Sequence, residues 1–385
     1  MLLSGRVVLD CTDRLGWLAG RILADLGAEV VKLDPPDTDR SAADWQAFNI
    51  NKRPVDLDVR TPVGRAELEA RIAKADIVLA SVQPGTASVE IFAYERLAAL
   101  NPGLILVAIS PFGLTGPRAE WKASDIELMA AGGAMSLAGE PDGAPRRISV
   151  PQSPPWTGSQ AAIGALVALN ERNRSGKGQL VDVSAQASIV ISLAHAPAFF
   201  DVEGKEPKRA GTFMTGRSVT GARFRVFWPC RDGHLNFIIY GGAAGRRTNE
   251  QLCAWMREAS ADLGPLAGID WKSFDPTKAT QAEIDAIEKP VSVFFLTLTK
   301  RQFLDGAHKR EMLGYPVSTV ADIAGDPQLE ARGFWQSVTG PDGVVRRHAG
   351  SFAVIDGKRP PLVQYPVDSR QKPSAAKKAV AEETR

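Results

Sequence analysis

Short apolar runs alternate with amphipathic stretches through the first 110 residues, and this alternation restricts the chain to few folds. The apolar runs resemble strands and fall at residues 6–10, 29–33, 55–58, 76–80 and 104–109. Helical spacing occupies residues 18–26, 60–74 and 94–100 between them. Strands and helices in this rhythm predict parallel βαβ units, and therefore an α/β fold with an open, doubly wound sheet. Ligands of such sheets bind near the carboxyl ends of strands, here the loops after Asp10, Leu33, Ala80 and Ile109.

The pattern changes further along the chain, and 385 residues exceed what one ordinary hydrophobic core can hold. A long helix over 160–173 and a strand over 179–183 continue the first domain. Residues 201–220 have the composition of a linker, and a hairpin around Arg231-Asp-Gly233 then begins a smaller α/β domain. We expect a large domain over 1–205, a small domain over 206–314, a return to the large domain over 315–370 and a disordered tail over 371–385.

Charge and cysteine content argue against several classes of protein. A net charge of +2 does not provide the basic surface that tracks nucleic-acid phosphates. No window approaches the roughly eighteen apolar residues of a membrane span, and the early charge of Arg6 argues against a signal peptide. Three cysteines at wide spacing and four scattered histidines favour neither a disulfide framework nor a metal site. We therefore expect a cytoplasmic protein without metal, nucleic-acid or membrane partners.

Six stretches in order carry a family resemblance. They are Leu23-Ala-Asp-Leu-Gly-Ala-Glu-Val-Val-Lys-Leu-Asp-Pro-Pro36, Phe48-Asn-Ile-Asn-Lys-Arg53, Tyr94-Glu-Arg-Leu97, Ser110-Pro-Phe-Gly-Leu-Thr-Gly-Pro117, the segment 150–187 and Asp326-Pro-Gln-Leu-Glu-Ala-Arg-Gly-Phe-Trp335. Together they resemble the family III CoA-transferases, which include formyl-CoA transferase, carnitine CoA-transferase and α-methylacyl-CoA racemase. The resemblance implies a Rossmann-like large domain built from both chain ends, a smaller middle domain, and a dimer of two subunits interlocked like linked rings.

The segment 150–187 resembles the active-site segment of that family but lacks its reacting group. In the family an aspartate carboxylate attacks the acyl-CoA thioester, and a carboxylate suits this exchange because it can be acylated and regenerated. Thr157-Gly158 and Gly164 anchor the alignment, and the aspartate position four residues before Gly158 is Pro154. Proline has no nucleophile and no N–H, although it suits a helix start. Residues 149–156 contain no Asp or Glu, so a shifted alignment does not restore the carboxylate.

The resemblance also implies residues that contact CoA. Lys122 lies thirty-two residues before Pro154, the spacing of a CoA-contacting lysine in formyl-CoA transferase, and a lysine there can pair with phosphate oxygens. A solvated loop lysine is the alternative interpretation. Arg40 is a candidate for the nucleotide phosphates, at a looser spacing. The loop after the first strand, where the family's adenine and pantetheine contacts fall, holds Arg14, Leu15 and Gly16.

Two further features near the expected site have more than one interpretation. The racemases of the family need a histidine beside an aspartate, and here Ser124 precedes Asp125, which argues against racemisation. Asp125 is either a buried orienting acid or a helix cap. The run Tyr240-Gly-Gly-Ala-Ala-Gly245 occupies the place of a mobile loop that covers the active site in formyl-CoA transferase, or is only a turn.

Three functions follow as hypotheses, each with acyl-CoA as the bound molecule. In the first, the chain is the subunit without the nucleophile in a heteromeric CoA-transferase. Arylsuccinate CoA-transferases resemble this arrangement, because they pair two family III chains of which one keeps the aspartate. In the second, a homodimer uses another carboxylate, Asp125 or Glu127, to transfer CoA between carboxylic acids. In the third, the chain is a scaffold that binds CoA without turnover.

Overall fold

The computed structural model describes residues 1–215, 219–239, 241–340 and 343–363. The chain divides into two compact units. Unit 1 comprises Met1–Met135, Arg147–Glu206 and the segment that begins at Pro327, and unit 2 comprises Ser136–Arg146 and Pro207–Asp326. The expected disordered tail, residues 371–385, lies outside the described residues.

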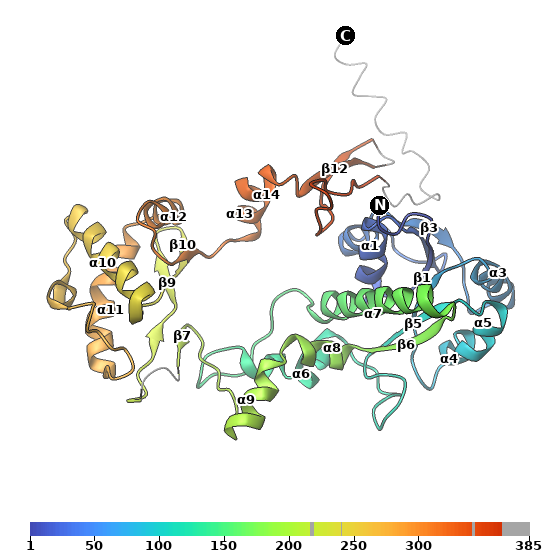
Figure 1. The fold of residues 1–385 in the computed structure, drawn as a ribbon, viewed down its shortest axis with the longest axis horizontal. Coiled ribbons are helices and arrows are strands. Elements are labelled where there is room, and N and C mark those ends of the chain that lie inside the picture. Colours follow the sequence, from blue (N-terminus) through green and yellow to red (C-terminus); the bar gives the residue numbers. More distant parts are fainter. Residues whose placement is uncertain (216–218, 240, 341–342, 364–385) are drawn as a thin grey trace, which may run out of the picture. The chain divides into compact units, whose positions relative to one another are not determined.

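Unit 1 is organised by one parallel sheet of six strands in the order β3-β2-β1-β4-β5-β6 (Figure 1). Its strands are β1 (Val7–Cys11), β2 (Glu29–Asp34), β3 (Arg53–Asp56), β4 (Ile77–Ser81), β5 (Ile105–Ser110) and β6 (Gln179–Ser184). In register, Leu9 of β1 lies opposite Val31 of β2 on one side and Val78 of β4 on the other. The strand order reverses direction between β1 and β4. The doubly wound α/β sheet predicted from the sequence is therefore confirmed.

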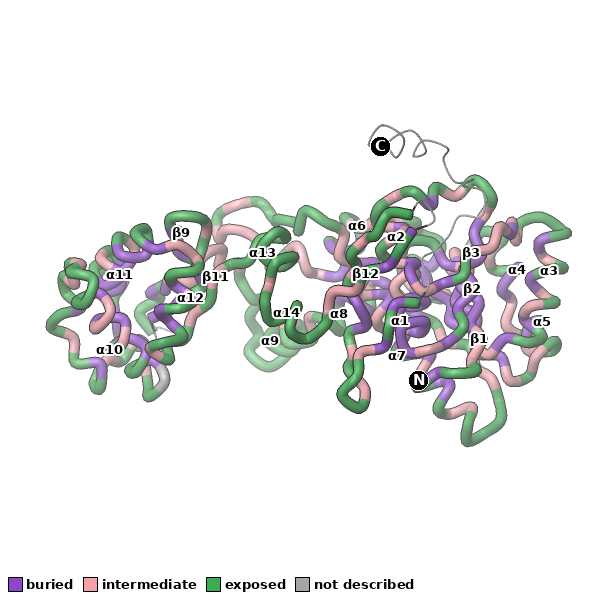
Figure 2. Tube along the Cα trace, turned by 90° about the horizontal axis from the view of Figure 1, so that it is seen from above, coloured by how far each residue is buried: buried purple, intermediate pink, exposed green. Residues whose placement is uncertain are grey.

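Helices cover both faces of this sheet, so its central strands are apolar on both sides. Alternate residues of β5 enter two different cores: Ile105 and Val107 pack with helices α1 (Trp17–Asp25) and α7 (Ser153–Ser175), whereas Leu106 packs with α3 (Pro62–Ile72) and α5 (Tyr94–Leu100). Figure 2 shows β1 and β2 largely buried. The continuous apolar runs of the sequence therefore supply side chains to two buried layers, one on each face of the sheet.

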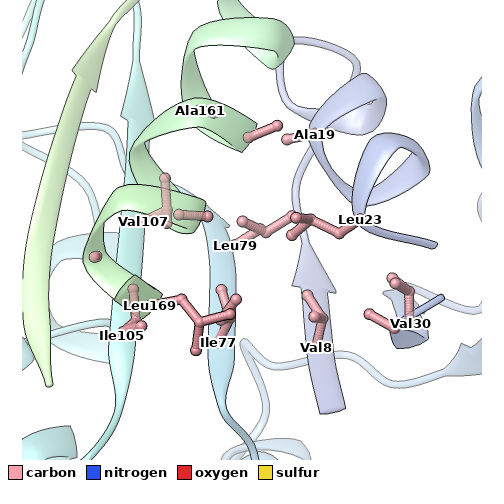
Figure 3. Packing of buried hydrophobic residues seen from close by; sticks show 14 of the residues in the cluster. Val8, Ala19, Leu23, Val30, Ile77, Leu79, Ile105, Val107, Ala161 and Leu169 are labelled. Carbon is pink, nitrogen blue, oxygen red and sulfur yellow. The ribbon is translucent and has the colours of Figure 1, made fainter. Parts of the chain in front are cut away.

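The pair α1 and α7 approaches closely because small residues line the contact. Ala19 of α1 faces Ala161 of α7, and both side chains are fully buried (Figure 3). Gly158 also lies at this contact, where a Cβ atom would stand 2.8 Å from the Cβ of Leu18 and 3.1 Å from the backbone nitrogen of Ala19. Such distances leave no room for a methyl group without movement of one helix.

Substitution of Gly158 by alanine is therefore expected to lower the free energy of unfolding by about 1–3 kcal/mol, the usual cost of overpacking. Gly103→Ala is the matched control, because the Cβ atom there would meet its nearest neighbour at 3.6 Å, an ordinary contact. Urea unfolding of the two variants measures the difference. Equal stabilities would show that the α1–α7 contact can open without cost.

Further helices complete the described part of unit 1. They are α2 (Ala43–Asn49), α4 (Ser88–Ile91), α6 (Asp125–Ala131), α8 (Ala185–Ser192), α9 (His195–Glu203) and α14 (Pro327–Ala331). Within the described part of the chain, no single helix is long and apolar enough to cross a bilayer, although α8 and α9 together meet that test as a pair bent by 67°.

The last described segment of the chain packs back on the first. It contains the hairpin of β12 (Trp335–Thr339) and β13 (Val345–Ala349). Arg21 of α1 donates a hydrogen bond of 2.6 Å to the carbonyl of Ala349, and Ile50 forms a small apolar cluster with Val338 and Leu362. Unit 1 is therefore assembled from chain segments about 300 residues apart.

Unit 2 has its own core, rich in aromatic residues. Its strands are β7 (Phe213–Met214), β8 (Phe224–Arg225), β9 (Phe227–Cys230), β10 (Gly233–Asn236) and β11 (Tyr315–Pro316), and its helices are α10 (Gly242–Glu258), α11 (Gln281–Leu296), α12 (Lys300–Lys309) and α13 (Val320–Ala324). Trp228 packs edge-on against Phe295, with ring centroids 5.5 Å apart. β11 pairs with β10, and unit 2 extends to Asp326, whereas the sequence led us to expect a large-domain segment over 315–370.

Candidate functional site

A cavity of about 650 Å³ lies in unit 1 at the carboxyl end of the sheet. Its walls are the loops after β1, β4 and β5, the segment 122–128 and the start of α7. It therefore sits where the strand order reverses between β1 and β4, the position at which open α/β sheets bind ligands. Three of the four loops expected from the sequence line this pocket, and the loop after Leu33 does not.

A buried ion network occupies the end of β2 instead. Lys32 contacts Asp34 at 2.7 Å between Nζ and Oδ1. Arg40 pairs with Asp56 at 2.7 Å and lies 3.7 Å from Asp34, with its side chain almost completely buried. Its guanidinium also lies over the ring of Trp45. Arg40, a candidate for the nucleotide phosphates, is therefore not among the residues that the structure brings together at the pocket.

Lys52, from the Asn-Lys-Arg motif, extends this network to β1. Its Nζ donates to three acceptors, each at 2.7 Å: the Asp10 carboxylate, the Asn49 side-chain carbonyl and the backbone carbonyl of Trp17. All three hydrogens of the ammonium group are thereby used. Asp10 in turn accepts hydrogen bonds from the backbone and hydroxyl of Thr12. The network thus fixes the loop that leaves β1 toward the pocket.

Burial and neighbouring charges of opposite sign shift the pKa values of Asp10 and Lys52 in opposite directions. Burial alone would raise the pKa of Asp10, but the charges of Lys52 and Lys32 outweigh it and hold that pKa below its ordinary value. Burial lowers the pKa of Lys52 to about 8, although the Asp10 carboxylate acts in the opposite direction. At neutral pH both groups are therefore charged, as their hydrogen-bond geometry requires.

The loop after β1 places two of its three predicted residues in the pocket wall. Arg14 lines the pocket and forms an ion pair of 2.9 Å with Asp44 at the start of α2. Leu15 lines it as well and packs against the apolar cluster beneath. Gly16 lies just behind, where a Cβ atom would stand 2.6–2.8 Å from Thr12 and Ile109, so only glycine fits the start of α1.

Lys122 lines the same pocket from the opposite loop, and its side chain is exposed. The preceding residue, Trp121, is 56% exposed and lies edge-on to Phe112. An exposed cation in the pocket wall can meet a phosphate as a point charge. Lys122 therefore lines the same pocket as Arg14 and Leu15.

The first turn of α7 forms another part of the wall, and it presents no free backbone donor. Ser153 and Pro154 line the pocket, and both are buried. The N–H of Ser153 donates to the carboxylate of Asp125. Pro154 and Pro155 have no N–H. The N–H of Trp156 donates to the backbone carbonyl of Gln152 inside the helix. Within this turn, all of which the structure describes, neither a carboxylate nor an unbonded amide faces a ligand.

Asp125 and Glu127, the two carboxylates considered as nucleophiles, both accept hydrogen bonds from backbone N–H groups. Oδ1 of Asp125 accepts hydrogen bonds from the N–H of Gln152 (2.8 Å), the N–H of Ser153 (2.8 Å) and the hydroxyl of Ser153 (2.9 Å). Glu127 is exposed and closes a capping box with Ser124, whose hydrogen bonds lower the pKa of Glu127. Asp125 is thus a cap, as one of its two interpretations held, but for α7 rather than for its own helix.

Sequence reasoning expected the loop after β4 but named none of its residues. Ser81, Gln83, Thr86 and Ser88 line the pocket there and add hydroxyl and amide groups. The Ser81 hydroxyl accepts a hydrogen bond of 3.0 Å from the backbone N–H of Asp13, which joins the loops after β1 and β4. The sequence indicated these lining residues only through their position directly after a predicted strand. Short polar residues in a loop have no pattern of their own that marks a binding site.

The glycine run and metal candidates add little to this site. Tyr240 lies outside the described residues, Gly241 is the N-cap of α10, and the rest of the run forms the first turn of that helix in unit 2. Among the described residues, no group of three or more His, Cys, Asp or Glu side chains could hold a metal ion.

Comparison with known proteins relates the chain to one enzyme family. The profile of CoA-transferase family III matches residues 3–364, almost the whole described chain. The chain belongs to this family. Family III CoA-transferases use acyl-CoA as a substrate, so the pocket at the carboxyl end of the sheet belongs to a fold that handles acyl-CoA.

Individual family III proteins match over nearly their full length. A succinate–glutarate CoA-transferase from Agrobacterium fabrum is 28% identical over 94% of this chain and 89% of its own. Subunit BbsE of a succinyl-CoA:(R)-benzylsuccinate CoA-transferase from Thauera aromatica is 29% identical over 86% of this chain and 82% of its own. A crystal structure of a CAIB/BAIF family protein from Brucella suis is 27% identical, covers 99% of each chain and has a TM-score of 0.78.

Proposed function

We propose that this chain is the subunit without the nucleophilic aspartate in a heteromeric family III CoA-transferase. It acts beside a paralogous chain that carries the aspartate. The observation that carries the proposal is Pro154, which is buried in the pocket wall at the position of the family carboxylate. Proline can be neither acylated nor protonated, so in this proposal a second family III chain supplies the reacting group.

The acidic residues that line the pocket support the proposal, because both already accept hydrogen bonds from backbone N–H groups. Of the described residues that line it, two are acidic, Asp13 and Asp125. Asp13 accepts a hydrogen bond from the backbone N–H of Leu15 in its own loop, and Asp125 holds the start of α7. A carboxylate that already fixes backbone loses those hydrogen bonds when it is acylated. Glu127 is not among the lining residues and is bound in its capping box.

One relative favours the heteromeric form in particular. The Thauera aromatica protein is itself named as a subunit of a CoA-transferase. Homodimeric transfer through Asp125 or Glu127, and CoA binding without turnover, are the competing functions.

The three unpaired cysteines, Cys11, Cys230 and Cys253, accord with a cytoplasmic location, where thiols stay reduced.

Affinity purification of the tagged chain from its native host tests the proposal. We expect it to retain a second family III chain that carries an aspartate at the position of Pro154. The complex should transfer CoA from succinyl-CoA to a panel of carboxylic acids, and neither chain should do so alone. Transfer by this chain alone as a homodimer would refute the proposal. CoA binding without transfer in any co-purified complex would favour the scaffold.

Replacement of Lys122 by alanine is expected to weaken CoA binding about five- to tenfold, the effect of losing one exposed charge-assisted contact to phosphate. The loss should shrink as the ionic strength rises, since salt screens exposed charges. Isothermal titration with CoA at two salt concentrations measures both effects. Lys177→Ala, at an exposed lysine that does not line the pocket, is the matched control. Equal affinities of the two variants would remove Lys122 from the site.

A further inference from the structure

Asp125 connects two walls of the pocket that are far apart in sequence. It is the first residue of α6, and its carboxylate reaches Gln152 and Ser153, 27 and 28 residues further on. It also follows Lys122 by three positions, and both residues line the pocket with Ser153 and Pro154. One carboxylate oxygen therefore joins the wall that carries the cation to the wall that begins α7.

The start of α7 depends on this contact because the helix offers itself no cap. Gln152 is the N-cap residue and makes no side-chain capping bond. The next two positions after Ser153 are prolines, which supply no N–H for a local cap to accept. Asp125 takes over that role from outside the helix, and its negative charge lies at the positive end of a 23-residue helix.

The direction of the Asp125 side chain is itself fixed. Ser124 and Glu127 form a reciprocal capping box around the first turn of α6, so the backbone that carries Asp125 has a defined orientation. Leu128 and Met129, in the next turn, are buried against Ala185 and Ile189 of α8. The segment 122–128 is thus anchored on one side in the core and on the other side on α7.

We infer that Asp125 is a positioning residue, which holds Lys122 at a set separation from the start of α7 so that the pocket fits the phosphate and thioester ends of one CoA ester. The inference rests on the proposed binding of CoA in this pocket. It assigns Asp125 no bond to the substrate. Its carboxylate acts through the backbone of Gln152 and Ser153, which it keeps beside the cationic loop.

Three variants of the full chain test this role. Asp125→Ala removes all three hydrogen bonds and is expected to raise the Kd for CoA about tenfold or more. Asp125→Asn keeps an acceptor oxygen at the same place and should stay within about threefold of wild type. Ser153→Ala removes one bond of the three and should fall between them. Hydrogen exchange of the segment 150–158 without ligand should speed up in the same order, because its amides lose their acceptor.

Val107→Ala is the control for a merely structural effect, since it opens the buried core of the sheet away from the pocket. It should lower thermal stability without a change in CoA affinity. If Asp125→Ala binds CoA as tightly as wild type, or if Asp125→Asn loses as much affinity as Asp125→Ala, the positioning role is refuted while the proposed function stands. If the wild-type chain binds no CoA, both are refuted.

Discussion

Replacement of Lys52 by methionine is expected to lower the free energy of unfolding by about 3–5 kcal/mol, because it leaves a buried carboxylate without its main counter-charge. The Lys52 ammonium donates to Asp10, Asn49 and Trp17, and the side chains of Lys52 and Asp10 are fully buried. Methionine has a similar volume but no donor, so these acceptors would remain desolvated and unpaired. Lys32, 3.8 Å from the same carboxylate, can compensate only in part.

Urea unfolding measures this loss, and two further variants separate charge from packing. Lys74→Met changes an exposed lysine and should cost less than about 0.5 kcal/mol. The double variant Lys52→Met with Asp10→Asn removes both charges, so its loss should be smaller than the sum of the two single losses. A loss below 1 kcal/mol for Lys52→Met would mean that water reaches Asp10 in the folded protein.

Hydroxylamine trapping is expected to label one subunit of the proposed complex and leave the other unlabelled. Hydroxylamine attacks the carbonyl carbon of the activated aspartate, displaces the acyl group as its carboxylate or CoA as its thiol, and leaves a hydroxamate that mass spectrometry detects. After incubation with succinyl-CoA, the aspartate of the partner chain should carry the modification and this chain should carry none, because Pro154 offers no carboxylate and Asp125 is engaged with α7.

Kinetics of the reconstituted complex provide the second half of that test. Removal of the partner's aspartate should reduce kcat by about 10³-fold or more, the scale of losing a covalent nucleophile. Asp125→Asn in this chain should change kcat by less than about tenfold, because a positioning role leaves the reacting groups in place. A hydroxamate on Asp125 or Glu127 would instead establish this chain as a catalyst in its own right.

The parallel sheet was predictable because its strands follow a simple rule. Runs such as Leu104–Ile109 are apolar throughout, as strands covered on both faces must be, and the structure places β5 at nearly the same residues. The long helix was predicted to start at Gln160 but begins at Ser153. Two consecutive prolines usually argue against a helix, yet here they occupy the first turn, where their missing N–H groups cost nothing.

The ion network was not predictable in the same way. Lys32 stands in an apolar strand and Lys52 in a polar turn, and each is an ordinary surface residue by composition. Their burial depends on partners 22 and 42 residues away, which meet only when β1, β2 and α2 have packed. The same holds for Asp125, whose hydrogen-bond partners Gln152 and Ser153 lie 27 and 28 residues further on. Charge pairing across the fold has no periodicity for a sequence to display.

Because the last described segment of unit 1 begins at Pro327, synthesis on the ribosome leaves unit 1 incomplete until that segment has been made. The Arg21 guanidinium lacks the Ala349 carbonyl, and Ile50 lacks Val338 and Leu362, until more than 300 residues have been made. Unit 2 can fold first, because its last residue is Asp326. A released fragment that ends before residue 335 should therefore protect the aromatic core of unit 2 from protease while the flank of α1 remains open to cleavage.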